Sequence, residues 1–505
     1  MKAKQIGFQV LRRLFKPRYL DLSAPANTSI VLKWSRLWTQ DTGIIDDLGL
    51  SFNYLNQKVI FREEIDWNYS DNGKLWTYNL NYFEYLSNPE ISDDLKLATM
   101  RDFYAKRFTI NDGMEPYPIS LRNINWIKFC FASGIREFDN FIYSQTALLS
   151  KSVEYHLMGN HLLENGFSLL FAAYYFKDLT FYKLASRVLQ KQLGEQILSD
   201  GAHFERSPMY HQIILYRLLD AINLIQHSKW ETDLISNCEK IASSMLSWLL
   251  NISYSDGKVP MVNDCSNGIA PTTDELKRYA KLLDVHPQPL PLGSSGYRMI
   301  QKGAYECFID IGDVGPDYIP GHAHSDTFSF ELYHRGQPLI IDTGISTYEN
   351  NKIRHFERST AAHNTIQLND LDQSEVWGAF RVAGRARVKI HEEQKDHFCS
   401  SHDGYKSRTG ITHQREFIFE TSQIIIKDSL LGTSSPSAKA FFHFPPGLEP
   451  ILSGKKCQIN TSAISFENGL ARLMSYQKAE GFNNRVTSQV LEIEFSDKLE
   501  VKIVI

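Results

Sequence analysis

The spacing of apolar residues divides the chain into two parts. In the first half, apolar residues recur every three or four positions, as they do on the buried stripe of an amphipathic helix. The segments 161–176, 207–225 and 233–250 show this period clearly. Ser207 followed by Pro208 is a typical helix start, because serine caps free N–H groups and proline fits the first turn. Several such helices with short connections predict a bundle of paired antiparallel helices.

A different pattern fills the second half. The segment 286–296 (HPQPLPLGSSG) carries three prolines and two glycines and predicts a linker. Beyond it, apolar and polar residues alternate, which predicts antiparallel strands in the segments 305–312, 327–333, 338–342, 412–420, 423–430 and 499–505. We therefore expect an α+β chain of four regions: an N-terminal segment 1–75, a helical domain 76–285, a linker 286–297 and an antiparallel β-sandwich 298–505.

Composition restricts the function classes. The formal net charge of the 505 residues is -4, which argues against a nucleic-acid-binding protein. An acidic polymer would need a local basic cleft instead. The six cysteines are scattered without a C-x-x-C pair, so we expect buried thiols and neither a zinc ribbon nor a disulfide framework.

The N-terminus is basic and shows no secretory signal. Arg12 and Arg13 interrupt its apolar stretch, so the continuous apolar core of a signal peptide is missing. No run of about 18 apolar residues occurs, and we predict no transmembrane segment.

The stretch MGNHLLENG offers a first group of functional side chains. It places Asn160 before a helix, with His161 and Glu164 three positions apart on one helical face. One interpretation makes Asn160 a helix cap and the other two residues a surface pair. The alternative directs the Asn160 amide and His161 at a carboxylate of a substrate.

The stretch GAHFERSPMYHQ crowds five functional side chains at a loop-to-helix junction: His203, Glu205, Arg206, Tyr210 and His211. Helix starts favour anions, because their N–H groups are unpaired and the dipole is positive there. A tyrosine beside an arginine and two histidines can have a lowered pKa, so Tyr210 is a candidate catalyst. The alternative is an aromatic residue that only packs.

The stretch PGHAHSDTF contains two histidines two positions apart. In a regular strand His322 and His324 would face the same side. Asp342 follows across a predicted hairpin, and His363 begins another alternating segment. His324, Asp342 and His363 have the composition of a Zn²⁺ site. A polar, solvent-facing sheet edge is the competing interpretation.

Charged and aromatic residues elsewhere supply weaker candidates. Arg354, Arg358 and Arg381 flank the possible metal site and could contact sulfate or carboxylate groups; the alternative is that they are surface charges. The full set of predicted substrate-binding residues is Arg122, Asn123, Glu164, His203, Glu205, Arg206, Tyr348 and Arg358. The chain lacks the G-x-S-x-G, P-loop, H-E-x-x-H and Rossmann motifs, which weakens several hydrolase, kinase and dehydrogenase hypotheses.

Four motifs together resemble the heparinase II/III family of polysaccharide lyases. They are GNHLLENG, HFERSPMYHQ, HAHSDTFSFELY with LIIDTG, and RSTAAHNTIQLNDLDQSE, and the resemblance extends from about residue 76 to the C-terminus. It implies an N-terminal (α/α) toroid joined to an antiparallel β-sandwich. It also implies cleavage of an acidic, uronic-acid-containing polysaccharide by β-elimination, which leaves a 4,5-unsaturated sugar.

The resemblance also assigns roles. Asn160 and His161 would neutralise the uronate carboxylate, which stabilises the developing negative charge. Tyr210 would act on the C5 proton or the leaving oxygen, alone or together with His322.

The same resemblance implies a structural divalent metal, zinc in the first instance, held by His324, Asp342 and His363. His322 would then face the cleft while His324 turns toward the metal. The two side chains must diverge, so the stretch has to bend or lie just outside the strand, which Pro320 and Gly321 permit.

Two other functions stay open on the sequence. One is a glycan-binding or assembly protein of a bacterial surface polysaccharide pathway with the same fold. The other is a glycoside hydrolase, for which Glu164 and Glu205 are the only acidic pair we can nominate. The family resemblance implies the periplasm or cell envelope, whereas the lack of a visible signal favours the cytoplasm.

Overall fold

The computed structural model describes residues 5–9, 17–26, 30–33, 45–46, 49–433 and 436–505. The predictions about the N-terminal basic stretch depend on Arg12 and Arg13, which lie outside these residues. Within them, every helix is too short or too polar to cross a membrane.

The chain forms two compact units. Unit 1 comprises Met1–Ile197, Gln212–Leu246 and Gly268–Gln288, and unit 2 comprises Leu198–His211, Ser247–Asn267 and Pro289–Ile505. The main division after Gln288 falls within the predicted linker. Two segments that we assigned to the helical domain, Leu198–His211 and Ser247–Asn267, group instead with the β-rich unit. They carry Tyr210, Ser207 and Asp264.

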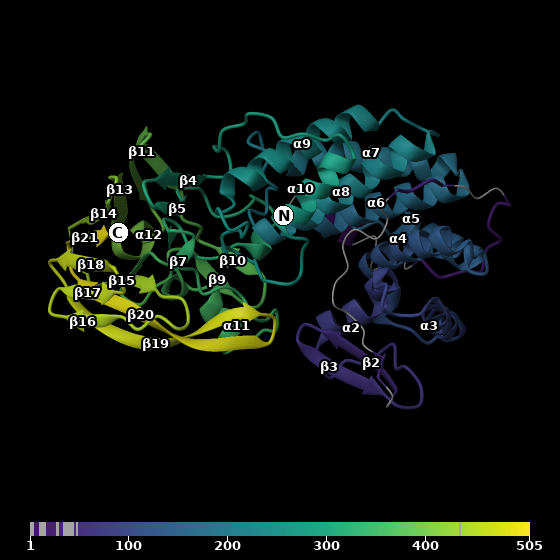
Figure 1. The fold of residues 1–505 in the computed structure, drawn as a ribbon, viewed down its shortest axis with the longest axis horizontal. Coiled ribbons are helices and arrows are strands. Elements are labelled where there is room, and N and C mark those ends of the chain that lie inside the picture. Colours follow the sequence, from purple (N-terminus) through teal and green to yellow (C-terminus); the bar gives the residue numbers. More distant parts are fainter. Residues whose placement is uncertain (1–4, 10–16, 27–29, 34–44, 47–48, 434–435) are drawn as a thin grey trace. The chain divides into compact units, whose positions relative to one another are not determined.

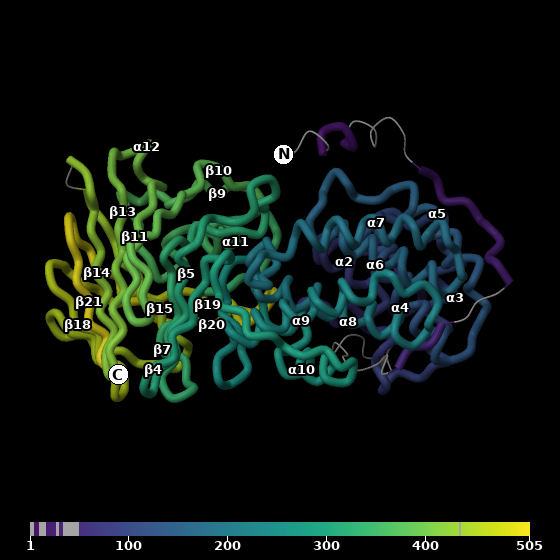
Figure 2. The backbone as a smooth tube through the Cα atoms, turned by 90° about the horizontal axis from the view of Figure 1, so that it is seen from above, coloured from purple at the N-terminus to yellow at the C-terminus, as the bar shows by residue number. Residues whose placement is uncertain are grey.

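Unit 1 is mainly helical (Figures 1 and 2). Its small sheet is β1 (Ile45–Asp46), β2 (Gly49–Tyr54) and β3 (Gln57–Phe61). Its helices are α2 (Lys74–Tyr82), α3 (Asp93–Ala105), α4 (Pro116–Ser133), α5 (Asp139–Ser152), α6 (Gly159–Phe176), α7 (Leu179–Gln196) and α10 (Thr273–Leu282). Helices α8 (Pro208–Ser228) and α9 (Ile235–Ile252) each contribute to both units.

Helix α6 lies at the centre of unit 1. All of its residues are buried except His161, as expected for a helix packed on every side. It packs against α4, α5 and α7. At Gly166 a Cβ atom would lie 2.9 Å from the Leu189 side chain of α7, so glycine allows the close approach of these two helices.

Unit 2 consists mainly of antiparallel sheets, whose strands are the arrows in Figure 1. An eight-stranded sheet has the order β11-β12-β13-β14-β21-β18-β17-β16, and two four-stranded sheets have the orders β19-β20-β15-β8 and β4-β5-β6-β7. A separate hairpin pairs β9 (Glu375–Trp377) with β10 (Arg381–Ala383). The other strands are β4 (Tyr297–Lys302), β5 (Tyr305–Asp310), β6 (Phe330–His334), β7 (Gln337–Ile340), β8 (Ile366–Leu368), β11 (Val388–Gln394), β12 (His397–His402), β13 (Thr412–Phe419), β14 (Gln423–Leu431), β15 (Ala438–His443), β16 (Ile451–Ser453), β17 (Lys456–Ile459), β18 (Ser462–Glu467), β19 (Leu470–Gly481), β20 (Asn484–Phe495) and β21 (Lys498–Val504).

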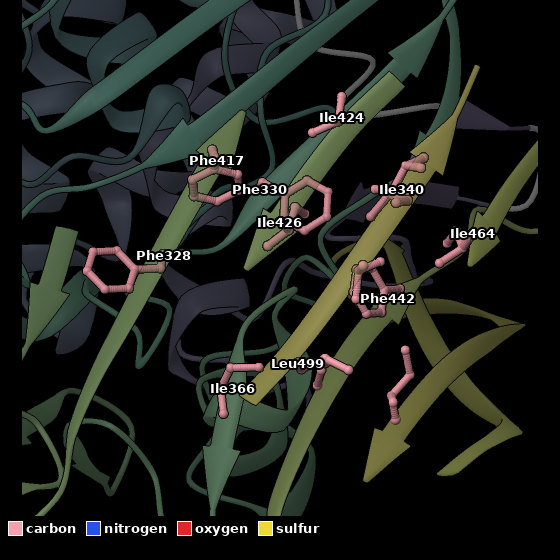
Figure 3. Packing of buried hydrophobic residues seen from close by; sticks show 14 of the residues in the cluster. Phe328, Phe330, Ile340, Ile366, Phe417, Ile424, Ile426, Phe442, Ile464 and Leu499 are labelled. Carbon is pink, nitrogen blue, oxygen red and sulfur yellow. The ribbon is translucent and has the colours of Figure 1, made fainter. Parts of the chain in front are cut away.

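The core of unit 2 lies between the sheets. Strand β13 alternates buried and half-exposed residues along its whole length, which places one set of side chains inside. Figure 3 shows Phe417 of this strand among Phe330, Ile426 and Phe442, which come from three other strands. The alternation read from the sequence therefore corresponds to the faces that are buried.

The stretch with His322 and His324 lies outside the regular strands, as predicted. Residues Pro320–His322 form a single 3₁₀ turn, and β6 begins only at Phe330. The period of two therefore does not apply to the two histidines. All six cysteines are free, as expected; five are buried, and Cys399 is half-buried.

Candidate active site

Asp264 joins three functional side chains in unit 2. Its Oδ2 atom lies 2.7 Å from His322 Nδ1, and its Oδ1 atom lies 2.9 Å from His324 Nε2. Arg354 donates to both oxygens, with an Nη2–Oδ2 distance of 2.8 Å. Because a carboxylate only accepts, both imidazoles donate to it. His322 therefore carries a proton on Nδ1, and His324 carries one on Nε2. The other ring nitrogen of His322, Nε2, does not bind Asp264.

Burial and charge act in opposite directions on this carboxylate. Asp264 has no exposed side-chain surface. Burial alone would raise the pKa of its carboxyl group, but the Arg354 guanidinium and the hydrogen bonds from His322 and His324 lower that pKa well below its usual range. Asp264 is therefore a permanent anion beside His322. Such a group holds an imidazole in one orientation.

Tyr210 lies against the His322 ring. The two ring centroids are 4.3 Å apart, and the Tyr210 hydroxyl lies 3.0 Å from that of Tyr348. Ser207 positions the tyrosine, because its Oγ accepts from the Tyr210 backbone N–H at 3.4 Å and donates to the Asp264 carbonyl at 2.6 Å. The predicted cap of this helix is confirmed, and it also ties Tyr210 to the Asp264 loop.

The expectation of a lowered pKa for Tyr210 is wrong. Burial raises the pKa of its hydroxyl well above the usual value, and the negative charge of Asp264 adds to the increase. The arginine of the predicted motif, Arg206, is not among the main influences on Tyr210. Tyr210 therefore keeps its hydroxyl proton in the resting protein.

The three predicted metal ligands lie together without forming a complete ligand set. His363 Nδ1 lies 2.7 Å from Asp342 Oδ2, and the His324 and His363 rings are 5.3 Å apart. The other nitrogens, His324 Nδ1 and His363 Nε2, are buried and have no hydrogen-bond partner in the described structure. Asp342 orients His363 as carboxylates do behind metal-bound histidines. Among the described residues, no three His, Cys, Asp or Glu side chains have metal-binding spacing. The metal and its ligands therefore stay a prediction.

Asn160 and His161 belong to unit 1. Helix α6 starts at Gly159 without a side-chain cap, so the interpretation of Asn160 as a helix cap is wrong. His161 is one-third exposed; its Nδ1 lies 3.4 Å from Glu154 Oε1, and its ring lies 4.2 Å from that of Tyr117. It does not form the surface pair with Glu164. The assignment of both residues to substrate carboxylate recognition stays a prediction.

Glu164, Arg122 and Asn123 are less suited to bind substrate than the sequence suggested. Glu164 is buried, and its carboxylate accepts from Arg217 Nε at 3.2 and 3.3 Å. Arg122 is also buried, and its guanidinium donates to the Gln145 side chain and to two backbone carbonyls. Asn123 is buried beside Thr146. These contacts indicate structural roles within unit 1.

The other predicted substrate residues are in unit 2. Glu205 is buried with Oε2 4.0 Å from His322 Nε2, which places it beside the catalytic candidate. His203 is buried, and burial lowers its pKa well below the usual value, so it is neutral. The Arg206 backbone carbonyl accepts from Asn263 and Tyr297. The assignment of Glu205, His203 and Arg206 to substrate binding stays a prediction.

The burial of Arg358 argues against its predicted contact with substrate. Arg358 is 1 % exposed, and its guanidinium donates to the backbone carbonyls of Ala323 and Ala379 at 3.0 and 3.1 Å. A guanidinium that binds carbonyl oxygens in this way supports the backbone of these loops. Tyr348, by contrast, presents its hydroxyl to Tyr210 within the candidate site.

Comparison with known proteins decides the family. A model of the heparinase II/III N-terminus matches residues 132–290, and a model of the heparinase II/III-like C-terminal region matches residues 286–498. The chain belongs to the heparinase II/III family. The two matches meet at the predicted linker.

Two curated relatives of this family member are similar along part of the chain. A heparin-sulfate lyase of Bacteroides stercoris is 23% identical over 325 residues, which are 58% of this chain and 47% of the relative. A heparin-sulfate lyase of Pedobacter heparinus is 22% identical over 359 residues, 65% of this chain and 52% of the relative. The chain thus matches about half the length of these relatives.

A solved structure extends the likeness to the whole chain. The crystal structure of heparinase III superposes with a TM-score of 0.68 at 14% identity and covers 99% of this chain and 89% of that one. At this identity the match shows the fold. The predicted (α/α) toroid followed by an antiparallel β-sandwich is confirmed.

Proposed function

We propose that the protein is a polysaccharide lyase that cleaves a uronic-acid-containing glycan by β-elimination. The observation that supports it most strongly is the group of Asp264, His322 and Tyr210. It joins an imidazole oriented by a buried anion to a neutral tyrosine in ring contact with it. Family membership and the heparin-sulfate lyase relatives support the same reaction class.

The two side chains divide the proton transfers in this proposal. His322 Nε2 takes the C5 proton of the uronate, and the Asp264 carboxylate stabilises the imidazolium that results. The electron pair forms the C4–C5 double bond, and the C4–O bond breaks. Tyr210 gives its proton to the departing oxygen. Because the pKa of its hydroxyl is raised, this transfer has to occur together with cleavage of the C4–O bond. Proton exchange with water then restores both groups.

We also propose the carboxylate partners and the metal. Asn160 and His161 neutralise the uronate carboxylate, which makes the C5 proton more acidic. A divalent metal would be held by His324 Nδ1 and His363 Nε2, with Asp342 orienting the second imidazole. The metal would stabilise the loops that carry these residues, and no proton transfer depends on it.

The hydrolase hypothesis finds less support. It needs two carboxyl groups that are free to act as acid and base. Glu164 is bound to Arg217, and burial together with this ion pair fixes it as a structural group. The glycan-binding hypothesis is tested by the same assay, because binding without an unsaturated product would favour it.

The experiment compares the wild type with Tyr210→Phe and His322→Gln on heparan sulfate, chondroitin sulfate, hyaluronan and alginate. Ultraviolet absorbance reports the unsaturated product. Each variant should lower turnover by about 10²–10⁴-fold, the range for loss of a general acid or base. A wild-type protein that binds a polymer and never forms an unsaturated end would contradict the lyase proposal.

A further inference from the structure

The hairpin of β9 and β10 places exposed aromatic rings beside the candidate active site. Its turn is Gly378–Ala379–Phe380, and Gly378 adopts a φ of 56°, a left-handed conformation that suits glycine. The Phe380 ring lies 5.7 Å from the His322 ring and 5.3 Å from the Tyr348 ring, yet Phe380 remains 43% exposed. We call the segment Trp377–Arg381 the lip.

Two buried arginines fix the backbone of the lip. Arg354, which also binds Asp264, donates from Nε to the Ala379 carbonyl at 3.1 Å. Arg358 donates to the carbonyls of Ala379 and Arg381 at 3.1 and 3.3 Å. It also donates to the Ala323 carbonyl, next to the two histidines. The lip and the catalytic loop are therefore held together by charged groups inside the protein.

The outer face of the lip pairs an aromatic ring with a cation. Trp377 and Arg381 are directly opposite each other in the hairpin, so their side chains project from the same face. Trp377 is 51% exposed, and Arg381 is exposed as well. In the described part of the chain no carboxylate pairs with the Arg381 guanidinium, whereas the nearby Arg387 has Asp313 and Asp317.

We propose that the lip is a binding subsite for an acidic sugar of the glycan chain. The indole face of Trp377 stacks on the pyranose ring, and Arg381 pairs with the carboxylate or sulfate of the same sugar. A rigid exposed tryptophan costs little conformational entropy when a ligand covers it, and an adjacent guanidinium matches an anionic group. The subsite is continuous with the candidate active site through Phe380, so it binds a sugar next to the one that is cleaved. This inference rests on the proposed function.

Binding can be measured apart from cleavage. In Tyr210→Phe protein, affinity for size-defined heparan sulfate, chondroitin sulfate, hyaluronan and alginate oligosaccharides is compared with and without Trp377→Ala or Arg381→Gln. Trp377→Ala should weaken binding about tenfold, as loss of an aromatic anchor does. Arg381→Gln should weaken it several-fold and reduce its salt dependence. In the active enzyme both changes should raise KM and leave kcat within about twofold, because they remove uniform binding.

Matched controls separate this subsite from general effects. Arg387→Gln removes one exposed positive charge of the same unit. Phe108→Ala removes an aromatic residue of unit 1 that is 67% exposed. Neither change should alter binding. Unchanged affinity in both lip variants would overturn the subsite while the lyase proposal stands. Binding that depends on the lip without any cleavage would overturn the lyase proposal alone. No binding of any oligosaccharide by the parent would overturn the subsite.

Discussion

Replacement of Asp264 by asparagine removes the charge that organises the candidate site and keeps nearly the same shape. In the wild type this carboxylate accepts from His322, His324 and Arg354. The amide can accept through only one oxygen, and its NH₂ group would face donors. Arg354 would be left fully buried without a counter-ion.

The size of the effect follows from this burial. Removing one partner of a buried ion pair costs about 3–5 kcal/mol, because the other charge stays desolvated. For a unit of this size, that loss lowers the melting temperature by roughly 6–20 °C. His322 also loses its orienting anion, so turnover should fall by about 10²–10⁴-fold at temperatures where the variant is folded.

The structure offers a matched control in Asp428. This carboxylate is also buried, lies 2.7 Å from His413 Nε2, and receives two hydrogen bonds from Arg415 at 2.8 and 3.0 Å. Asp428→Asn should therefore cost similar stability in the β-sandwich and leave turnover nearly unchanged. Thermal unfolding followed by circular dichroism, together with kcat measured well below both melting temperatures, compares the two variants.

Two results would show that Asp264 does not act by orienting His322 for catalysis. Equal activity losses in both variants would mean that Asp264 acts only through stability. Full activity of folded Asp264→Asn would mean that His322 does not need its anion, and the assignment of His322 as the proton acceptor would fail.

Four further predictions test other parts of the structure. Tyr348→Phe should lower kcat far less than Tyr210→Phe, since it removes only a hydroxyl partner; equal losses in steady-state kinetics would reverse their roles. Glu164→Gln should lower the melting temperature and keep turnover, and loss of turnover in folded protein would revive the hydrolase hypothesis. His363→Ala should lose bound metal in elemental analysis while Asp428→Asn keeps it, and a wild type without metal after supplementation would contradict the site. The stability cost of Asp428→Asn should shrink in acid, because burial raises the pKa of Asp428 but Arg415 lowers that pKa by more. The carboxylate's contribution to stability is then complete above about pH 4 and disappears as the pH falls through the lowered pKa of the folded state. A constant cost down to pH 3 in denaturation experiments would contradict this.

Local patterns predicted most of the fold. The alternation in 412–420 and 423–430 corresponds to β13 and β14, because each strand has one buried face. Ser207 and Pro208 marked the start of α8, since capping is decided by neighbouring residues. The sequence could not show that Leu198–His211 groups with the β-rich unit, because that depends on contacts with distant segments.

Only those residues of the candidate site that belong to a sequence motif could be predicted. Tyr210 and His322 came from motifs, and the structure brings their rings into contact. Asp264 was missed, because it lies in an irregular loop and its partners are 58, 60 and 90 positions away. Arg122 and Arg358 were assigned to substrate because a guanidinium suits the carboxylate or sulfate of an acidic sugar. Both are buried on backbone carbonyls, a role that leaves no periodic signal.

The proposed β-elimination is tested most directly by incubating the purified protein with heparan sulfate, chondroitin sulfate, hyaluronan and alginate and measuring formation of an unsaturated uronate. The Tyr210→Phe variant is measured beside the wild type. Ultraviolet absorbance and mass spectrometry of the products identify the C4–C5 double bond. We expect an unsaturated end on at least one polymer and its near disappearance in the Tyr210→Phe variant. Products that carry added water, or equal activity of the two proteins, would contradict it.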